Sequence, residues 1–67
     1  HQVKILKRID HLLENILINP YIGIGNPEPL KYELSGLWSR RINKEHRFTY
    51  RVINENKIEI VSLRYHY

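Results

Sequence analysis

The sequence predicts a single α+β domain, in which an N-terminal helix packs on one face of a small twisted antiparallel sheet of about four strands. Three observations predict this fold. Apolar residues recur at helical spacing near the start of the chain, polar and apolar residues alternate in the second half, and turn-forming residues separate short extended runs. A chain of 67 residues has room for only one domain with a small core.

The first predicted element is an amphipathic helix over residues 3–18. Its apolar residues recur at spacings of three and four, which places them on one face: Leu6, Ile9, Leu12, Leu13, Ile16 and Leu17. Asn19-Pro20 ends the helix, because proline disfavours helical geometry in the residue before it. The pattern is under way at the first residues without a capping residue, which predicts that a preceding segment is absent from this sequence.

An irregular connection over residues 21–29 and four extended runs follow the helix. The connection holds two of the three glycines and two of the three prolines, and it ends in Pro27-Glu28-Pro29. The flanking prolines stiffen the backbone of the glutamate. The extended runs cover residues 30–34, 37–42, 46–53 and 57–63, with turn residues between them. This spacing predicts an antiparallel meander.

The third run predicts a sheet with one buried and one exposed face. Two sets of side chains alternate along it, namely Phe48, Tyr50 and Val52 against Arg47, Thr49 and Arg51. If Ile42 and Phe48 both face the helix, Arg41 lies on the opposite, open face of the sheet. It shares that face with Arg47. Adjacent arginines on an open sheet face predict a phosphate-binding surface.

The basic charge is concentrated in the second half of the chain. There are 11 Lys and Arg residues against 7 Asp and Glu residues. Eight of the basic and four of the acidic residues lie from Lys31 onward, so the whole net charge of +4 belongs to that half. Such a surface suits a polyphosphate partner, although a basic composition also serves solubility alone.

The composition argues against several classes of protein. Without cysteine the chain has no disulfide framework, thiolate nucleophile or cysteine-ligated zinc site. The four histidines lack the close spacing of a zinc helix, and glycine patterns for nucleotide binding are missing, so we expect neither a metal nor a cofactor. No apolar run approaches the roughly 20 residues of a membrane span. No signal peptide is recognisable, and we expect a soluble, cytoplasmic protein with no membrane partner.

Each candidate functional residue also has a structural interpretation. Glu28 lies in the stiff connection, and on local evidence alone a loop glutamate is more often only a solvated carboxylate. Arg47 would otherwise form an exposed ion pair with a glutamate of a neighbouring turn, worth less than about 1 kcal/mol. His66 lies beside the C-terminus, where disorder is the default. Trp38 and Tyr50 are expected in the core and not as stacking platforms for bases.

Four sequence blocks change these odds when they are taken together. In chain order they are Gly25-Asn26-Pro27-Glu28-Pro29-Leu30-Lys31, Leu34-Ser35-Gly36-Leu37-Trp38-Ser39-Arg40-Arg41-Ile42, Glu45-His46-Arg47-Phe48-Thr49-Tyr50 and Arg64-Tyr65-His66-Tyr67. In this order and spacing the blocks closely resemble the YoeB-type toxins of the RelE superfamily. The resemblance is dense over residues 23–50 and again in the last four residues, and weaker elsewhere.

The resemblance implies a compact RelE/YoeB-like fold and a metal-independent endoribonuclease that cleaves mRNA in the ribosomal A site. By motif position it implies that Glu28 is the general base and that Arg47 stabilises the phosphate. It implies that His66 is the general acid and Tyr67 the terminal aromatic of the site. The expected products are a 2′,3′-cyclic phosphate and a 5′-hydroxyl, formed by attack of the RNA 2′-hydroxyl. Basic residues of the second half are expected to contact RNA: Lys31, Arg40, Arg41, Lys44 and Arg51.

The implied partners are mRNA, ribosomal RNA and a cognate antitoxin protein that silences the toxin, and a homodimer is an open alternative. Family members begin with a strand and a helix ahead of the helix predicted here. We therefore expect residues 1–67 to form one domain that is N-terminally incomplete relative to the family. The alternative function is a truncated, non-catalytic module that binds an antitoxin or RNA. The complete set of Glu28, Arg47, His66 and Tyr67 favours the enzyme.

Overall fold

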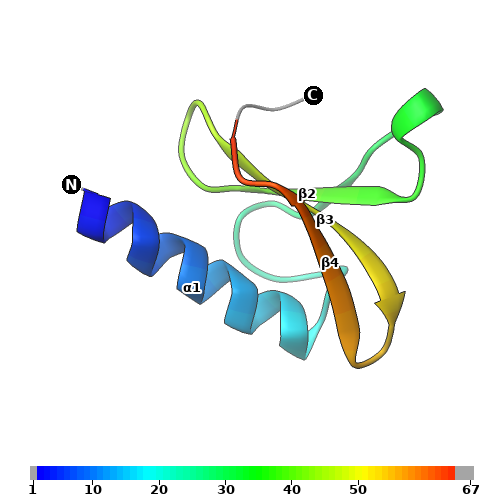
Figure 1. Cartoon of the computed structure of the whole chain (residues 1–67), viewed down its shortest axis with the longest axis horizontal. Helices are drawn as coiled ribbons and strands as arrows, with labels where there is room; N and C mark the ends of the chain where they lie inside the picture. The colour runs from blue at the N-terminus through cyan, green and yellow to red at the C-terminus, as the bar shows by residue number, and fades with distance from the viewer. Residues whose placement is uncertain (1, 65–67) are drawn as a thin grey trace.

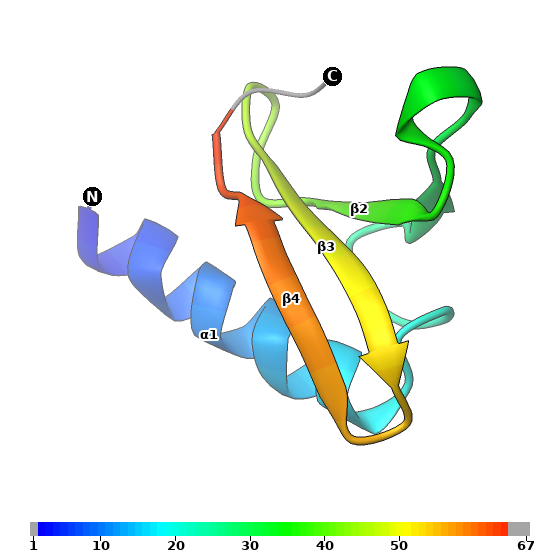
Figure 2. The same cartoon turned by 45° about the vertical axis from the view of Figure 1, so that its right-hand side comes forward.

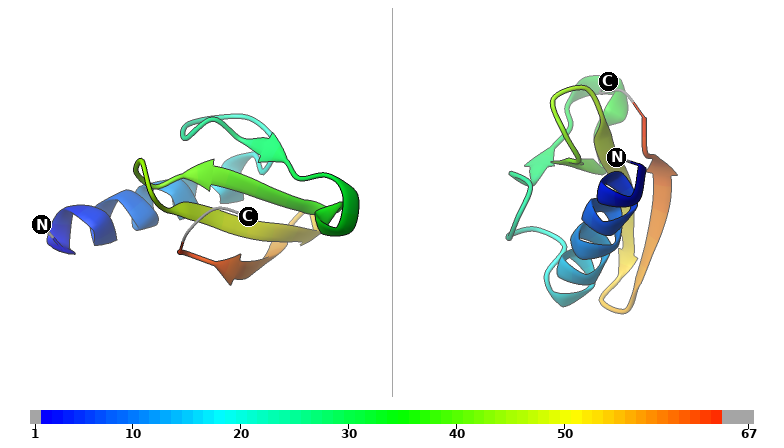
Figure 3. Two further views of the ribbon diagram at one scale, coloured as in Figure 1. Left: turned by 90° about the horizontal axis from the view of Figure 1, so that it is seen from above. Right: turned by 90° about the vertical axis from the view of Figure 1, so that its left-hand side faces the viewer.

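The computed structural model describes residues 2–64 as one helical layer beside one sheet (Figure 1). Its elements are the helix α1 (Gln2–Ile18), strand β1 (Glu28–Pro29), the 3-10 turn η1 (Tyr32–Leu34) and strands β2 (Leu37–Arg41), β3 (Arg47–Asn54) and β4 (Lys57–Ser62). The strands form one sheet in the order β1-β2-β3-β4, and neighbouring strands are antiparallel. Figure 3 shows α1 on one side of this sheet. The predicted α+β meander is confirmed.

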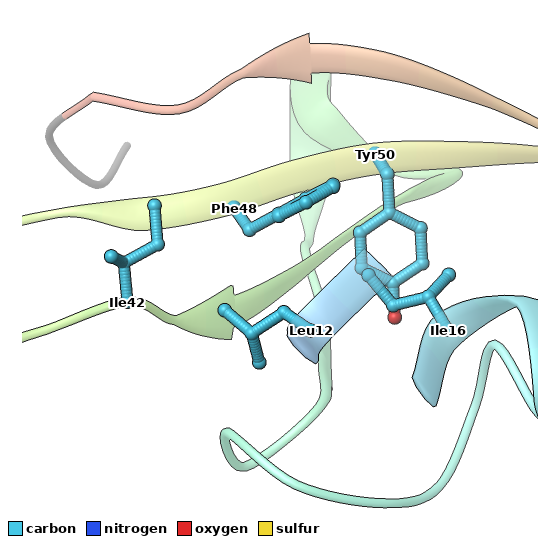
Figure 4. Close-up of a cluster of buried hydrophobic side chains, with 5 residues drawn as sticks. All are labelled: Leu12, Ile16, Ile42, Phe48 and Tyr50. Carbon is cyan, nitrogen blue, oxygen red and sulfur yellow. The ribbon is translucent and has the colours of Figure 1, made fainter. Parts of the chain in front are cut away.

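The core lies between α1 and the sheet. Leu12 and Ile16 of α1 are fully buried against Ile42, Phe48 and Tyr50 (Figure 4). The rings of Phe48 and Tyr50 meet edge to face, with centroids 5.9 Å apart. Burying each of these side chains stabilises the fold by roughly 1.5 to 3 kcal/mol, so five of them hold the helix on the sheet. The helix α1 does not cover the opposite face of the sheet.

The buried stripe of α1 is displaced from the predicted one by a fraction of a turn. Ile5, Ile9 and Leu13 are half-buried beside the core residues. Leu6 and Leu17, in contrast, are 61% and 54% exposed. The three-and-four spacing holds along both edges of the apolar face, and only the edge nearer to the strands is covered.

One predicted strand is wrong. Residues 30–34 do not form a strand, because they hold η1 and the turns around it, and the first strand lies earlier, at Glu28–Pro29. The backbone N–H of Leu30 donates to the carbonyl oxygen of Leu37 at 2.9 Å, so the residues between them must reverse the chain. Positive φ angles at Tyr32 (58°) and Gly36 (98°) make this reversal. The other three predicted runs agree with β2, β3 and β4 to within one residue at each end.

The turn between β2 and β3 is held by its own polar groups. The side-chain oxygen of Asn43 accepts hydrogen bonds from the backbone N–H groups of Glu45 and His46, at 2.9 and 2.8 Å. The N–H of Ile42 donates to the carbonyl oxygen of His46 at 3.0 Å. Such Asx-type bonds replace backbone pairing where the chain reverses. Figure 2 shows this turn at the junction of β2 and β3, which pair with each other from Arg41–Arg47 to Leu37–Arg51.

Candidate functional site

A small polar pocket lies on the side of the sheet opposite α1. Its volume is about 140 Å³. Strands β1, β2 and β3 and the connection before β1 supply its lining: Asn26, Glu28, Leu30, Ser39, Arg41, Arg47 and Thr49. One carboxylate and two guanidinium groups thus share a pocket that is otherwise made of small and neutral side chains.

The strand register explains how these residues meet. Glu28 lies opposite Ser39, and Ser39 lies opposite Thr49, which makes one row across three strands. Arg41 lies opposite Arg47 in a second row, two residues further along β2. Side chains two residues apart share a face of a sheet, and two residues span roughly 7 Å. The carboxylate row and the guanidinium row therefore stand side by side with room for a small anionic group.

The paired arginines carry like charges across two neighbouring strands. Directly opposed like charges destabilise a sheet. Arg41 is exposed and Arg47 is half-buried. The Nη1 atom of Arg47 donates to the carbonyl oxygens of Asn43 at 2.7 Å and His46 at 3.1 Å, so backbone oxygens hold this guanidinium in the turn. Neither arginine is paired with a carboxylate within residues 2–64, where the one ion pair joins Arg51 and Glu59. This arrangement favours an anionic ligand.

Glu28 supplies the negative charge of the same pocket. Its backbone is fixed in β1 by pairing with Ser39, and prolines stand on both sides of it. The side chain is exposed. The carboxylate forms no ion pair among the described residues, although Arg41 and Arg47 line the same pocket. An exposed carboxylate held near two cations without touching either is free to accept a proton from a bound group.

Two small polar residues form the floor of the pocket. Ser39 and Thr49 are buried beneath the charged side chains. The Oγ1 atom of Thr49 is buried and has no hydrogen-bond partner in the part of the chain that the structure describes. A buried hydroxyl without a partner costs roughly 1 to 3 kcal/mol. This cost favours an occupant that offers the hydroxyl a hydrogen bond.

The prediction that Arg40 contacts RNA is wrong, because the structure places this side chain in the interior. Arg40 is 0% exposed. Its Nη2 donates to the carbonyl oxygens of Asn19 (2.6 Å) and Ile22 (3.2 Å), its Nη1 donates to Asn15 Oδ1 (2.5 Å), and its Nε donates to the Tyr50 hydroxyl at 3.2 Å. These bonds tie the end of α1 and the following connection to β2. Arg40 is therefore a structural residue.

Tyr50 completes this buried network. Its hydroxyl donates to the carbonyl oxygen of Pro20 at 2.6 Å. Burial raises the pKa of Tyr50 above its ordinary value of 10.0, and the hydrogen bond from Arg40 opposes part of this increase. Trp38 is half-buried on the same side of the sheet and packs against the ring of Tyr21, with centroids 5.1 Å apart. Tyr50 is thus a core residue, as predicted, and Trp38 is half-buried against the core.

The remaining predicted site residues fall in different places. Lys31 is exposed just beyond β1 and does not line the pocket. Arg51 shares the sheet face of Arg47, but Glu59 pairs with it at 2.6 Å and offsets its charge. Lys44 lies in the turn between β2 and β3. His66 and Tyr67 lie outside the described residues.

Sequence reasoning missed one cation near the site. Arg8 of α1 donates from Nη2 to the carbonyl oxygen of Arg41 at 3.0 Å, and it lines a second pocket beside the arginine pair. The signal was present in the helix pattern. Arg8 stands three residues after Ile5 and four before Leu12, so it occupies a position of the buried stripe where an apolar residue is expected.

Neither a metal site nor a membrane span is found in the described residues. Residues 2–64 contain no group of three or more His, Asp or Glu side chains placed to hold a metal ion. Within the same range, no helix is both long and apolar enough to cross a bilayer.

Comparison with known proteins places this chain among bacterial toxins. Residues 1–67 match the family described as the YoeB-like toxin of bacterial type II toxin-antitoxin systems. Toxin YoeB of Synechocystis sp. is 53% identical over 64 residues, which are 96% of this chain and 73% of the relative. Toxin YoeB of Escherichia coli K12 is 47% identical over 64 residues, which are 96% of this chain and 75% of the relative.

Solved structures agree with the sequence comparison. The YoeB/ParE toxin from Agrobacterium tumefaciens has a TM-score of 0.90 at 41% identity, over 97% of this chain and 77% of that protein. A YoeB–YefM complex from Staphylococcus aureus has a TM-score of 0.88 at 48% identity, over 100% of this chain and 77% of that protein. A YoeB dimer from the same organism has a TM-score of 0.87.

Proposed function

The chain belongs to the YoeB-like toxins of bacterial type II toxin-antitoxin systems, and from this premise we propose that it is an endoribonuclease. Its substrate is mRNA in the A site of the ribosome, so its action blocks translation in the cytoplasm. The reaction needs no metal, because side chains supply both proton transfers and the charge stabilisation. The observation that carries the proposal is the shared pocket, in which Glu28 stands across from the Arg41–Arg47 pair without an ion pair between them.

Glu28 acts as the general base of this reaction. RNA carries its own nucleophile, because the 2′-hydroxyl lies next to the phosphate that it attacks. The Glu28 carboxylate takes the proton of this hydroxyl as the oxygen attacks phosphorus. An exposed carboxylate on a stiffened strand suits this task, since pairing with Ser39 holds its backbone and its oxygens are accessible to a substrate.

Arg47 stabilises the negative charge that develops on the phosphorane. Its guanidinium is fixed by backbone oxygens of the turn before the substrate arrives, so little reorganisation is needed during the reaction. Arg41, directly opposite on β2, adds a second cation to the same phosphate. The Thr49 hydroxyl at the floor supplies a further hydrogen-bond donor.

His66 protonates the 5′-oxygen that leaves, and Tyr67 completes the site. Both roles are proposed from the resemblance of the last four residues to the family motif. Cleavage then yields a 2′,3′-cyclic phosphate on one fragment and a 5′-hydroxyl on the other. The proton taken by Glu28 and the proton given by His66 balance, so the overall transesterification consumes no water.

Primer extension on a translated message tests the proposal. The purified chain is added to a reconstituted translation reaction, beside its Glu28→Gln and Arg47→Gln variants. We expect reading-frame-dependent cleavage by the unaltered protein. Glu28→Gln should lower the rate about 10²- to 10⁴-fold, and Arg47→Gln about 10²- to 10³-fold. Glu33→Gln and Lys57→Gln are matched controls, because both residues are exposed and line neither the pocket of Glu28 nor the pocket beside Arg8.

Folding must be measured for each variant by circular dichroism. Equal cleavage by folded Glu28→Gln and the unaltered chain would contradict the assignment of the base. A folded chain that binds an antitoxin but cleaves no message would instead identify a non-catalytic binding module.

We further propose that a cognate antitoxin protein covers this toxin. The related toxin from Staphylococcus aureus was solved as a complex with YefM and as a dimer. On this chain, Ile18 is 82% exposed and Ile22 is 67% exposed, in one stretch of the chain. Exposed apolar side chains on so small a domain favour a protein partner. Self-association into a dimer is the competing explanation of the same surface.

A further inference from the structure

A second pocket lies on the other side of the paired arginines. Its volume is about 410 Å³. Arg41 and Arg47 line both this pocket and the one that holds Glu28. The remaining lining comes from α1 and from the turn between β2 and β3: Arg8, Ile42, Asn43 and Lys44. The arginine pair thus forms a wall between two pockets, and only one of them contains a carboxylate.

Arg8 brings a cation from the helical layer to this pocket. Its guanidinium donates to the carbonyl oxygen of Arg41 at 3.0 Å, and the side chain is half-buried. One Nη2 contact leaves the other donors of the guanidinium for a ligand, since arginine carries five N–H groups in a fixed fork. The helix therefore holds Arg8 at the edge of the sheet and does not leave it free in solvent.

The turn holds the opposite side of the pocket. Backbone oxygens of Asn43 and His46 accept hydrogen bonds from Arg47, and the Asn43 side chain closes the turn. Lys44 projects from this ordered turn and is exposed. A pocket whose walls are fixed before binding loses little conformational entropy when it captures a ligand.

The charge of the pocket is not neutralised within residues 2–64. Arg8, Arg41, Lys44 and Arg47 all line it, and none of them is within 4.0 Å of a carboxylate oxygen in that range. Four cations at one small site repel one another. A multiply hydrogen-bonding anion relieves this repulsion, and phosphate matches the geometry of arginine best.

We propose that this second pocket binds an RNA backbone phosphate adjacent to the scissile one, with Arg8 and Lys44 as its specific ligands. This inference rests on the proposed nuclease function, which places the scissile phosphate in the first pocket. The two pockets are separated only by the cross-strand pair Arg41–Arg47. The β-carbons of such a pair stand about 5 Å apart. A strand that passes from one pocket to the other keeps the sugar with its reactive hydroxyl between two anchored phosphates. Arg8 and Lys44 thereby set the register of the message on the enzyme.

Binding of a short single-stranded RNA with 2′-O-methyl groups tests the subsite without any cleavage. The unaltered chain is compared with Arg8→Gln and Lys44→Gln. Arg8→Gln removes one hydrogen bond that is exposed to solvent, so the fold should persist, and thermal unfolding checks this. We expect each variant to bind about tenfold more weakly at low salt. The slope of log affinity against log salt should fall by roughly 0.7 per lost cation.

Two controls separate a specific site from general attraction. Lys7→Gln and Lys57→Gln remove exposed charges that line neither pocket, and they should change affinity by less than about twofold. Arg8→Lys should restore part of the affinity. In a second arm, the RNA carries one neutral methylphosphonate linkage, either 5′ or 3′ of the cleavage position. At one of these positions, Arg8→Gln should no longer weaken RNA binding, since the linkage that Arg8 contacts carries no charge.

Three results of the RNA-binding measurements would overturn the subsite. They are unchanged RNA affinity of Arg8→Gln and Lys44→Gln, an equal loss in the Lys7→Gln control, and penalties that persist with every neutral linkage. A loss of antitoxin binding with unchanged RNA binding would also overturn it, and would assign the pocket to a protein carboxylate. If primer extension detects no cleavage while the neutral linkage still abolishes the Arg8 effect, the nuclease proposal fails and the phosphate site stands.

Discussion

At the scale of single residues, the neighbours Arg40 and Arg41 have opposite fates. Arg40 is fully buried and hydrogen-bonded to the end of α1, whereas Arg41 is exposed in the candidate site. Strand alternation already contained this result, because Arg40 stands two residues before the core residue Ile42 and so faces the helix. The basic charge of Arg40 suggested RNA contact, whereas strand alternation had placed Arg41 on the open face of the sheet. The Arg40 side chain donates five hydrogen bonds to acceptors that are distant in the sequence, so no local sequence pattern predicts them.

Replacing Tyr50 by Phe tests this buried network. The hydroxyl accepts from Arg40 and donates to Pro20, so Tyr50→Phe leaves two buried polar groups without this partner. We expect the free energy of unfolding to fall by about 1 to 3 kcal/mol, measured by urea denaturation at pH 7. Phe48→Leu serves as a comparison that changes packing without touching the network. An unchanged stability of Tyr50→Phe would contradict the role of the network.

The Tyr50→Phe variant also tests how the stability of the fold depends on alkaline pH. Burial raises the pKa of Tyr50 in the folded chain above 10.0, so the unfolded chain loses this proton first. The contribution of Tyr50 to the free energy of unfolding is therefore complete below about pH 10. It is lost as the pH rises through the pKa of Tyr50 in the folded chain. The stability difference between the unaltered chain and Tyr50→Phe should shrink above pH 10.

At the scale of elements, the connection between α1 and β1 places the base of the proposed reaction. The carbonyl oxygen of Gly25 accepts a hydrogen bond from the N–H of Arg41 at 2.7 Å, which aligns the connection with β2 before Glu28 pairs with Ser39. Its two glycines suggested only an irregular segment. The path of this segment along β2 depends on long-range contacts. The sequence therefore predicted an irregular connection but not where it runs.

Gly25→Ala should disturb both stability and activity. At φ 81° an added Cβ is strained, and it would stand 2.8 Å from the Cδ2 atom of Leu12. Gly36→Ala is a matched control, because φ there is 98° but a Cβ meets open space. We expect a loss of about 1 kcal/mol for the control from backbone strain alone. Gly25→Ala should lose more than this and should also lower the cleavage rate, as measured by urea denaturation and primer extension. Equal effects of the two variants would mean that contact with Leu12 does not fix the connection.

At the scale of the whole molecule, much apolar surface stays outside the core. Ile18, Ile22 and Leu6 are more than half exposed, and so is Tyr32, at 91%. The helix and the meander were predictable because periodicity and turn residues act locally. Which side of the helix stays uncovered was not, because it depends on how the helix rotates against the sheet.

Binding of the cognate antitoxin should therefore stabilise the chain and bury apolar area. At a free antitoxin concentration one hundred times its Kd, the free energy of unfolding should rise by about 2.7 kcal/mol. Calorimetry at several temperatures should give a negative heat-capacity change of binding. An unrelated acidic peptide of equal length is the control for charge attraction. A heat-capacity change near zero would mean that the partner contacts polar surface instead.

The meander order of the sheet also has a kinetic consequence. Every strand pairs with its neighbour along the chain, so each hairpin closes over a short loop and pays little closure entropy. The pairing of β1 with β2 and of β2 with β3 is enough to bring Glu28 and the two arginines of the pocket together. We therefore expect the half of the sheet that carries the candidate site to form early and quickly during refolding, ahead of β4.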